Sequence, residues 1–277
     1  MPALKPRETG VVFWAGRERL EEVTALGLGC GQLAVADGVD LSAAAADEWK
    51  VRLAREGFTL VTVVAAYEGE DYADIPTVRR TVGFIPRETR AVRERRTLEA
   101  SDFAARLGVG SIACHVGCVP DDTGDADYVA VRDMVRRVCD HAAGHGQTFA
   151  LETGQERAEV LLEFIRQVGR PNLGINFDPA NMILYGTGDP IAALEAVAPL
   201  VRSVHCKDGD WPPAGLPGAL GQERPLGQGA VGIERFVGAL ARLGFTGPLN
   251  IEREGVTHEQ WLADVRMAVA LLAKLGS

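Results

Sequence analysis

Four residues whose side chains can bind a metal ion stand at the ends of short apolar runs in the second half of the chain. Glu152 ends the run FALE, Asp178 ends INFD, His205 lies in SVHCKD, and Glu252 ends NIE. A buried carboxylate is costly unless it is paired or bound to a cation, so apolar runs that end in acids require a compensating positive charge. Any one of these residues alone would favour an ordinary ion pair or a core histidine, whereas the four together favour a divalent metal site.

The spacing of these residues fits neighbouring repeats of one strand and one helix. Glu152, Asp178 and His205 are each about one such repeat apart, and Glu252 follows after a repeat with a longer loop. Three carboxylates and one imidazole form a mostly oxygen ligand set, which suits Mn²⁺, Mg²⁺ or Co²⁺ and tolerates Zn²⁺. We therefore expect one divalent metal ion, with Mn²⁺ as the first candidate.

Three further polar residues near these runs are candidates for substrate contacts. His115 in IACHVG could bind substrate, contact the metal indirectly or simply pack. Lys207 lies two residues after His205, so strand alternation places both side chains on one face of the strand. From there Lys207 either reaches the substrate or forms an ion pair with Asp208 at the rim of the barrel. Asn181 in DPAN could donate a hydrogen bond to a substrate hydroxyl or close a turn.

Short runs rich in Val, Ile, Leu and Phe alternate with longer stretches of helical period, which is typical of repeated βα units. The sequence predicts eight strands, at residues 11–14, 31–34, 60–65, 111–115, 148–152, 173–178, 201–207 and 248–252. It also predicts eight helices, at residues 17–27, 42–56, 88–107, 125–145, 156–169, 189–198, 232–243 and 258–275. Glycines mark several helix ends, and the pair Asp189-Pro190 marks a helix start.

Eight repeats in 277 residues predict a single (β/α)8 TIM barrel, with residues 1–277 as one domain. An open doubly wound sheet usually has fewer strands, and no glycine-rich dinucleotide fingerprint follows the first strand. In such barrels the active site lies at the carboxyl ends of the strands, which is where the four metal-ligand candidates stand.

The segment 209–231 is rich in glycine and proline and follows the seventh predicted strand. Loops at this place often close over a substrate, so the segment is interpreted as a lid. Its PLGQG sequence could hold a phosphate through backbone amides, although a flexible connector is the commoner meaning of such composition.

Composition limits the partners of the protein. A net charge of −9 argues against nucleic-acid binding, because that binding depends on clustered Lys and Arg. The basic run from Arg87 to Arg96 is interleaved with Glu88 and Glu94 and favours a solvated helix face. We expect a small-molecule partner, and a homo-oligomer is compatible with the barrel.

Five cysteines are scattered through apolar stretches and lack the spacing of a disulfide framework or a zinc ribbon, so we expect reduced, buried thiols. The start MPALKPRETG has no apolar signal region, and no stretch approaches the roughly 20 apolar residues of a membrane span. These features predict a cytoplasmic protein without a membrane partner.

With these motifs located, nearly the whole chain resembles the sugar phosphate isomerase/epimerase superfamily. These are xylose isomerase-like barrels that include ketose 3-epimerases, inosose dehydratases and hydroxypyruvate isomerases. The motifs that carry the resemblance are ALE at Glu152, FDPANMILYGTGDP around Asp178, VHCKDG at His205, PLGQG, and IERE at Glu252.

The resemblance implies that Glu152, Asp178, His205 and Glu252 bind one metal and that Glu152 and Glu252 also exchange protons with the substrate. A proton next to a carbonyl needs such help, because it leaves only when the resulting enediolate is stabilised. Return of the proton to the opposite face of the same carbon gives epimerisation, and return to the neighbouring carbon interconverts aldose and ketose. The expected substrate is a sugar, a sugar phosphate or a polyol.

The chain departs from many epimerases at Asn181, where they have a histidine, which argues against ketose 3-epimerase activity proper. With only five histidines it also lacks the set that the apurinic endonuclease branch uses for three zinc ions. Two alternatives stay open: an inosose-type dehydratase with the same metal site, and a sugar-binding barrel without catalysis. The glutamate pair favours the enzyme.

Overall fold

A closed barrel of eight parallel strands forms the centre of the computed structural model, which describes residues 7–276. The strands are β1 (Thr9–Trp14), β2 (Cys30–Val35), β3 (Thr59–Ala65), β4 (Ser111–Cys114), β5 (Thr148–Glu152), β6 (Leu173–Phe177), β7 (Val201–Cys206) and β10 (Leu249–Ile251). Their order around the barrel is β1-β10-β7-β6-β5-β4-β3-β2, so neighbours in sequence are neighbours in space. The predicted TIM-barrel fold is confirmed.

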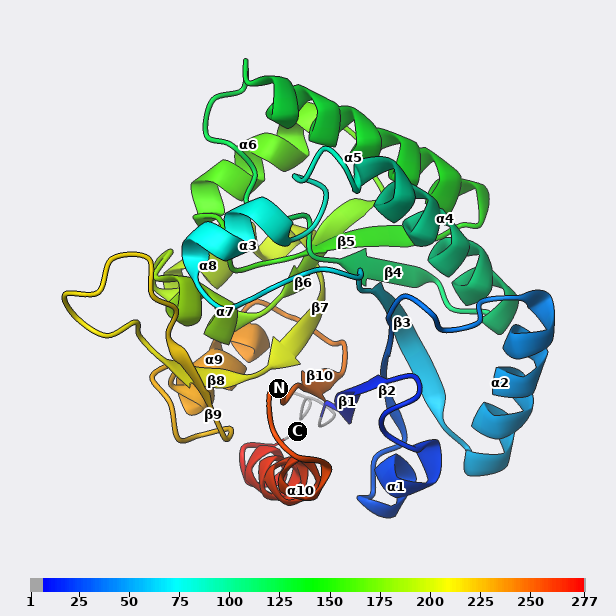
Figure 1. Ribbon diagram of the computed structural model, residues 1–277. Coiled ribbons are helices and arrows are strands. Elements are labelled where there is room, and N and C mark those ends of the chain that lie inside the picture. The colour runs from blue at the N-terminus through cyan, green and yellow to red at the C-terminus, as the bar shows by residue number, and fades with distance from the viewer. Residues whose placement is uncertain (1–6, 277) are drawn as a thin grey trace.

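Helices surround the barrel on the outside (Figure 1). The eight that follow the predicted pattern are α1 (Leu20–Ala25), α2 (Ala43–Glu56), α4 (Arg90–Leu107), α5 (Ala126–Gly144), α6 (Ala158–Val168), α8 (Pro190–Val197), α9 (Ile233–Arg242) and α10 (His258–Lys274). A single 3₁₀ turn, η1 (Ala198–Leu200), follows α8. Each predicted helix is present, and the largest boundary error is at the first, which is shorter than expected.

Two short helices were missed: α3 (Ile75–Thr81) and α7 (Pro179–Tyr185). Asp178 caps α7 by accepting hydrogen bonds from the backbone N–H groups of Ala180 and Asn181. Asp178-Pro179 is therefore the same helix-start signature as Asp189-Pro190. Of the two alternatives for Asn181, closing a turn is wrong, because the residue lies in the first turn of α7.

The inside of the barrel differs between its two halves. Five small apolar residues, one from each of β1 to β5, form their own cluster: Val12, Ala34, Val64, Ala113 and Ala150. Buried polar side chains fill the other side: Asn176 of β6, Ser203 and His205 of β7, and Asn250 of β10, joined by Gln32 of β2. Alternate strand residues, such as Phe13 and Phe149, point outward and pack against the helices in the main core.

The segment 209–231 is held to the barrel by Asp208. Its first part forms an antiparallel hairpin of β8 (Asp208–Asp210) and β9 (Gln222–Arg224), which projects to one side in Figure 1. The Asp208 carboxylate accepts hydrogen bonds from the backbone N–H groups of Gly227, Gly229 and Val231. The amides of Gly227 and Gly229 in PLGQG therefore bind an internal carboxylate, which argues against the alternative that PLGQG holds a phosphate. Lys207 pairs with other carboxylates, so the alternative of an ion pair between Lys207 and Asp208 is wrong.

The basic run on α4 also has a structural role. Arg93 is buried and donates to the carbonyls of Thr81 and Gly83, while Arg96 donates to those of Ala36 and Val39. The interpretation of this run as a solvated face is wrong for these two residues, which bind loop carbonyls at the rim of the barrel.

The cysteines of the described chain are free; Cys30, Cys114, Cys139 and Cys206 are buried and Cys118 is half-buried. Within residues 7–276, no helix has both the length and the apolar composition that a membrane crossing requires. Residues 1–6, which belong to the start that was predicted to lack a signal region, lie outside the described residues.

Candidate metal centre

The four predicted ligands meet at the carboxyl end of the barrel. Glu152 is the last residue of β5, Asp178 follows β6, His205 lies in β7, and Glu252 follows β10. One ligand atom from each lies within 4.8 Å of the others, and all four residues are buried. Parallel strands place their carboxyl ends on one rim, so residues far apart in sequence converge there.

The imidazole of His205 lies at the centre of this cluster. Its Nδ1 is 2.9 Å from Oε2 of Glu252, 3.4 Å from Oε1 of Glu152 and 3.7 Å from Oδ2 of Asp178. The opposite nitrogen, Nε2, is 3.0 Å from Oε1 of Gln32 and 2.9 Å from Nδ2 of Asn176. When Nε2–H donates to Gln32, the Nδ1 lone pair faces the carboxylates, as a metal ligand requires.

Two ligand atoms in the cluster have no hydrogen-bond partner within the described chain: Nδ1 of His205 and Oδ2 of Asp178. Both residues have an exposed fraction of 0%. A buried polar atom without a partner costs about 1–3 kcal/mol, and an unpaired buried charge costs more. A divalent cation would satisfy both atoms at once, so this donor set fits a metal ion.

A cavity of about 600 Å³ opens beside the cluster. Among the residues that line it, carboxylates outnumber lysines and arginines. The carboxylates are Glu70, Glu152, Glu223, Glu252 and Glu254, and the cations are Lys207 and Arg253. The opposite wall is apolar and comes from β1 to β3, where Val12, Trp14, Ala34 and Val64 lie. This surplus of negative charge favours a cation in the site.

Lys207 is the cation closest to the cluster. Its Nζ lies 3.1 Å from Oε2 of Glu252, 2.9 Å from Oε2 of Glu254 and 3.8 Å from Oδ2 of Asp178. Burial disfavours the charged ammonium, but the surrounding carboxylates, Glu252 first, raise the pKa of Lys207 well above its usual value. Lys207 therefore remains protonated, and its side chain shares the face of His205 as strand alternation predicts.

His115 and Asn181 both contact Glu152. Nε2 of His115 lies 3.3 Å from Oε1 of Glu152, and Nδ2 of Asn181 donates to the same oxygen over 3.1 Å. Burial of His115 opposes its charged form, yet the Glu152 carboxylate prevails and raises the pKa of His115 to about 9. Both residues also line the cavity, as does Lys207, so the three predicted substrate contacts lie in one place.

Several residues of the site were not singled out from the sequence. Gln32 and Asn176 stand in the middle of apolar strands, and a buried amide needs partners, which was a usable signal for both. Glu70 lies in a loop and Glu223 in the short strand β9, where a single acid is no signal. Burial raises the pKa of both carboxyl groups.

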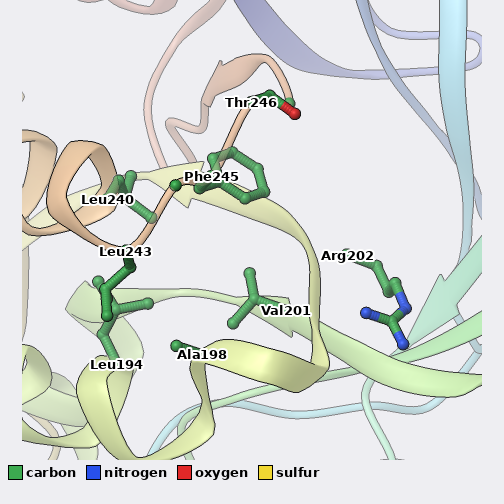
Figure 2. A pocket seen from close by; sticks show the side chains of 10 residues that line it. Leu194, Ala198, Val201, Arg202, Leu240, Leu243, Phe245 and Thr246 are labelled. Carbon is green, nitrogen blue, oxygen red and sulfur yellow. The ribbon is translucent and has the colours of Figure 1, made fainter.

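A different pocket, of about 340 Å³, lies between α8 and α9 at the start of β7, whereas His205 lies near the end of that strand (Figure 2). Its walls are mainly aliphatic, with Leu194, Val201 and Leu240 beside the ring of Phe245. It contains no carboxylate or imidazole, so we assign it no part in the chemistry.

Three comparisons with known proteins agree with this architecture. A family model described as a xylose isomerase-like TIM barrel matches residues 20–275. The crystal structure of a xylose isomerase domain protein from Planctomyces limnophilus is 43% identical with a TM-score of 0.94, over 98% of this chain and 97% of that one. A xylose isomerase-like TIM barrel protein from Mycobacterium smegmatis, solved in complex with magnesium, has a TM-score of 0.67 at 20% identity, over 93% and 88% of the two chains, and this likeness shows the fold.

Among curated proteins, a ketose 3-epimerase from Arthrobacter globiformis is 26% identical over 151 residues. The match covers 54% of this chain and 43% of that protein, so it spans less than half of the relative's length.

Proposed function

This chain belongs to the xylose isomerase-like TIM barrel family, and on that premise we propose that it is a divalent-metal-dependent sugar isomerase or epimerase. The observation that carries the proposal is the pair of buried carboxylates, Glu152 and Glu252, which lie 3.4 Å and 2.9 Å from Nδ1 of His205 at the wall of a cavity. The similarity to a ketose 3-epimerase supports the same class of reaction.

The positions of the two glutamates suit the transfer of a proton. β6 and β7 separate β5 from β10 around the barrel, so Glu152 and Glu252 approach the cavity from different strands. One carboxylate removes the proton next to the substrate carbonyl, and the other returns a proton. The four-residue cluster would hold a divalent ion, which would supply positive charge near the carbonyl oxygen where negative charge develops.

The remaining polar residues position these groups and the substrate. Asn181 and His115 hold Oε1 of Glu152, which fixes the direction of its carboxylate. The protonated Lys207 cannot act as a base, and it donates a hydrogen bond to a substrate oxygen near Glu252. We propose one ion per chain, Mn²⁺ first, and the magnesium complex of the Mycobacterium smegmatis protein supports the use of a divalent ion in such barrels.

The test measures metal content and proton exchange together. The metal-loaded protein is incubated in deuterated water with ketoses, aldoses, inososes and their phosphates, and mass spectrometry and NMR follow the products. We expect deuterium at a carbon next to a carbonyl, and a loss of about 10²–10⁴-fold in Glu152→Gln and in Glu252→Gln. Glu159→Gln is the control: Glu159 is exposed on α6, lines neither the cavity nor the cluster, and should leave the exchange unchanged.

The outcomes separate the alternatives. Loss of water from the substrate would identify a dehydratase that uses the same site. Bound metal without exchange on any compound would indicate a sugar-binding barrel, and a protein without affinity for divalent ions would overturn the proposal.

A further inference from the structure

A second cavity, of about 490 Å³, lies at the same end of the barrel as the metal centre. The loops after β4 and β5 and the end of α7 form its walls, with Arg79 of α3. Tyr185, the last residue of α7, lines both cavities. Cavities of roughly 300–1,000 Å³ accommodate small-molecule ligands, so this one has room for a sugar ring.

Two acceptor atoms among the residues that line this cavity are buried and receive no hydrogen bond within the described chain. They are Oε2 of Glu156 and Oε1 of Gln155. Oε1 of Glu156 accepts a hydrogen bond from the backbone N–H of Val119, and the residue is only 7% exposed. A buried polar atom without a hydrogen-bond partner costs about 1–3 kcal/mol, so both side chains have hydrogen-bonding capacity that the described residues leave unused.

The same walls also offer donors. The guanidinium groups of Arg79 and Arg157 are exposed, and neither forms an ion pair with a carboxylate in residues 7–276. The carboxyl groups of Glu156 and Asp121 lie beside these two cations, so the walls carry mixed polar groups rather than a cluster of positive charge that would suit a phosphate. Mixed donors and acceptors match sugar hydroxyls, because each hydroxyl both donates and accepts.

Gln155 stands at the boundary between the two cavities. Its Nε2 lies 3.1 Å from Nδ1 of His115 and 3.5 Å from the hydroxyl of Tyr185. His115 in turn contacts the metal-ligand candidate Glu152. These contacts link the second cavity to the metal centre through Gln155 and His115.

We propose that the second cavity is a subsite for a second sugar ring, so that the substrate is a glycoside or disaccharide rather than a free monosaccharide. This inference rests on the proposed function, because it assigns the reacting ring to the metal centre.

The test is isothermal titration calorimetry of the metal-loaded protein with the reducing disaccharides cellobiose, maltose, maltulose and isomaltulose, with glucose and fructose, and with glucose 6-phosphate. Each of these disaccharides keeps one ring that can open to a carbonyl, as the proposed reaction requires. We expect at least one disaccharide to bind at least tenfold more tightly than either of its component monosaccharides. Glu156→Gln and Arg157→Ala should each reduce that preference at least threefold. Arg80→Ala is the matched control: Arg80 is exposed on the same helix as Arg79 but does not line the cavity.

Three results would overturn the subsite. These are equal affinity for every disaccharide and its components, an equal loss in Arg80→Ala, and tightest binding of glucose 6-phosphate through Arg79 and Arg157. Failure of the proposed function has a different signature, since a disaccharide that binds with the expected preference but exchanges no deuterium would leave the subsite intact. Deuterium exchange on a monosaccharide, without tighter binding of any disaccharide, would instead support the proposed function and overturn the subsite.

Discussion

Two groups of histidine and carboxylate side chains in this molecule have the composition of a metal site, and their surroundings differ. The first is the buried cluster of Glu152, Asp178, His205 and Glu252. The second lies on the outside of the barrel, where Asp102 of α4 meets His141 of α5 and His145 just after it. Oδ1 of Asp102 lies 2.8 Å from Nε2 of His141 and 2.9 Å from Nε2 of His145.

The difference lies in which atoms remain unsatisfied. In the outer group each Nε2 already has the Asp102 carboxylate as its partner, and water reaches all three side chains. In the inner group Nδ1 of His205 and Oδ2 of Asp178 are sealed from water and form no hydrogen bond within the described residues, although other charged groups lie close to both atoms. Ligand types at short distance are therefore a weaker sign of a metal site than buried ligand atoms that nothing else satisfies.

The largest expected effect comes from Asp178→Asn. Asparagine can still cap α7, so the local fold should persist, but one charged ligand is lost. We expect metal affinity to fall by roughly 100-fold or more, because mutation of residues that only hydrogen-bond to the ligands already lowers metal affinity by about 10–100-fold. Thermal unfolding with and without Mn²⁺ measures this, since an ion at about 100 times its Kd adds about 2.7 kcal/mol to wild-type stability. Equal stabilisation of both proteins would remove Asp178 from the site.

A smaller effect is expected from Gln32→Leu, which removes the acceptor for Nε2 of His205 from inside the barrel. The imidazole then loses the partner that directs Nδ1 toward the carboxylates, so metal affinity should fall by roughly 10–100-fold. Metal titration gives the affinity, and the unfolding midpoint of the metal-free variant separates this effect from altered packing. Unchanged affinity would show that Gln32 does not orient the ligand.

Glu156 lies outside both groups of metal-ligand side chains, and it tests the same criterion, a buried polar atom that no hydrogen bond satisfies. Burial raises the pKa of Glu156 from 4.5 to about 7. Between these two pH values the folded protein therefore keeps a proton on Glu156 that the unfolded chain has released. This contribution to stability is fully present below pH 4.5 and is lost as the pH rises through 7. Glu156→Gln should therefore gain about 2 kcal/mol over wild type at pH 8 and little at pH 4.5, as measured by urea unfolding. The exposed Glu159→Gln on α6 is the control, and a gain independent of pH would contradict the assignment.

The smallest effect is expected in the outer group. Replacing both His141 and His145 with alanine removes two surface contacts, which are worth about 0–1 kcal/mol each. Metal stoichiometry, Mn²⁺-dependent stabilisation and deuterium exchange should all match wild type. A drop from two bound ions to one would show that the outer group also binds metal and would break the comparison.

Local sequence patterns predicted much of this protein. Alternation of apolar runs and helical stretches predicted the eight strands and the barrel, and the acids that end those runs identified the four residues of the cluster. The two short helices escaped because they lie in loops outside the repeat, although Asp178-Pro179 signalled one of them. Arg93 and Asp208 were misjudged because their partners, backbone groups of other loops, have no side-chain pattern.

By itself the sequence determined which residues stand at the strand ends, because that position depends only on the order of strands and helices along the chain. Tertiary structure decided what those residues face: Gln32 reaches His205 across 173 positions, and Glu156 lies buried beside a second cavity. Such contacts depend on the closure and register of the barrel, which bring together residues whose local sequences carry no information about each other.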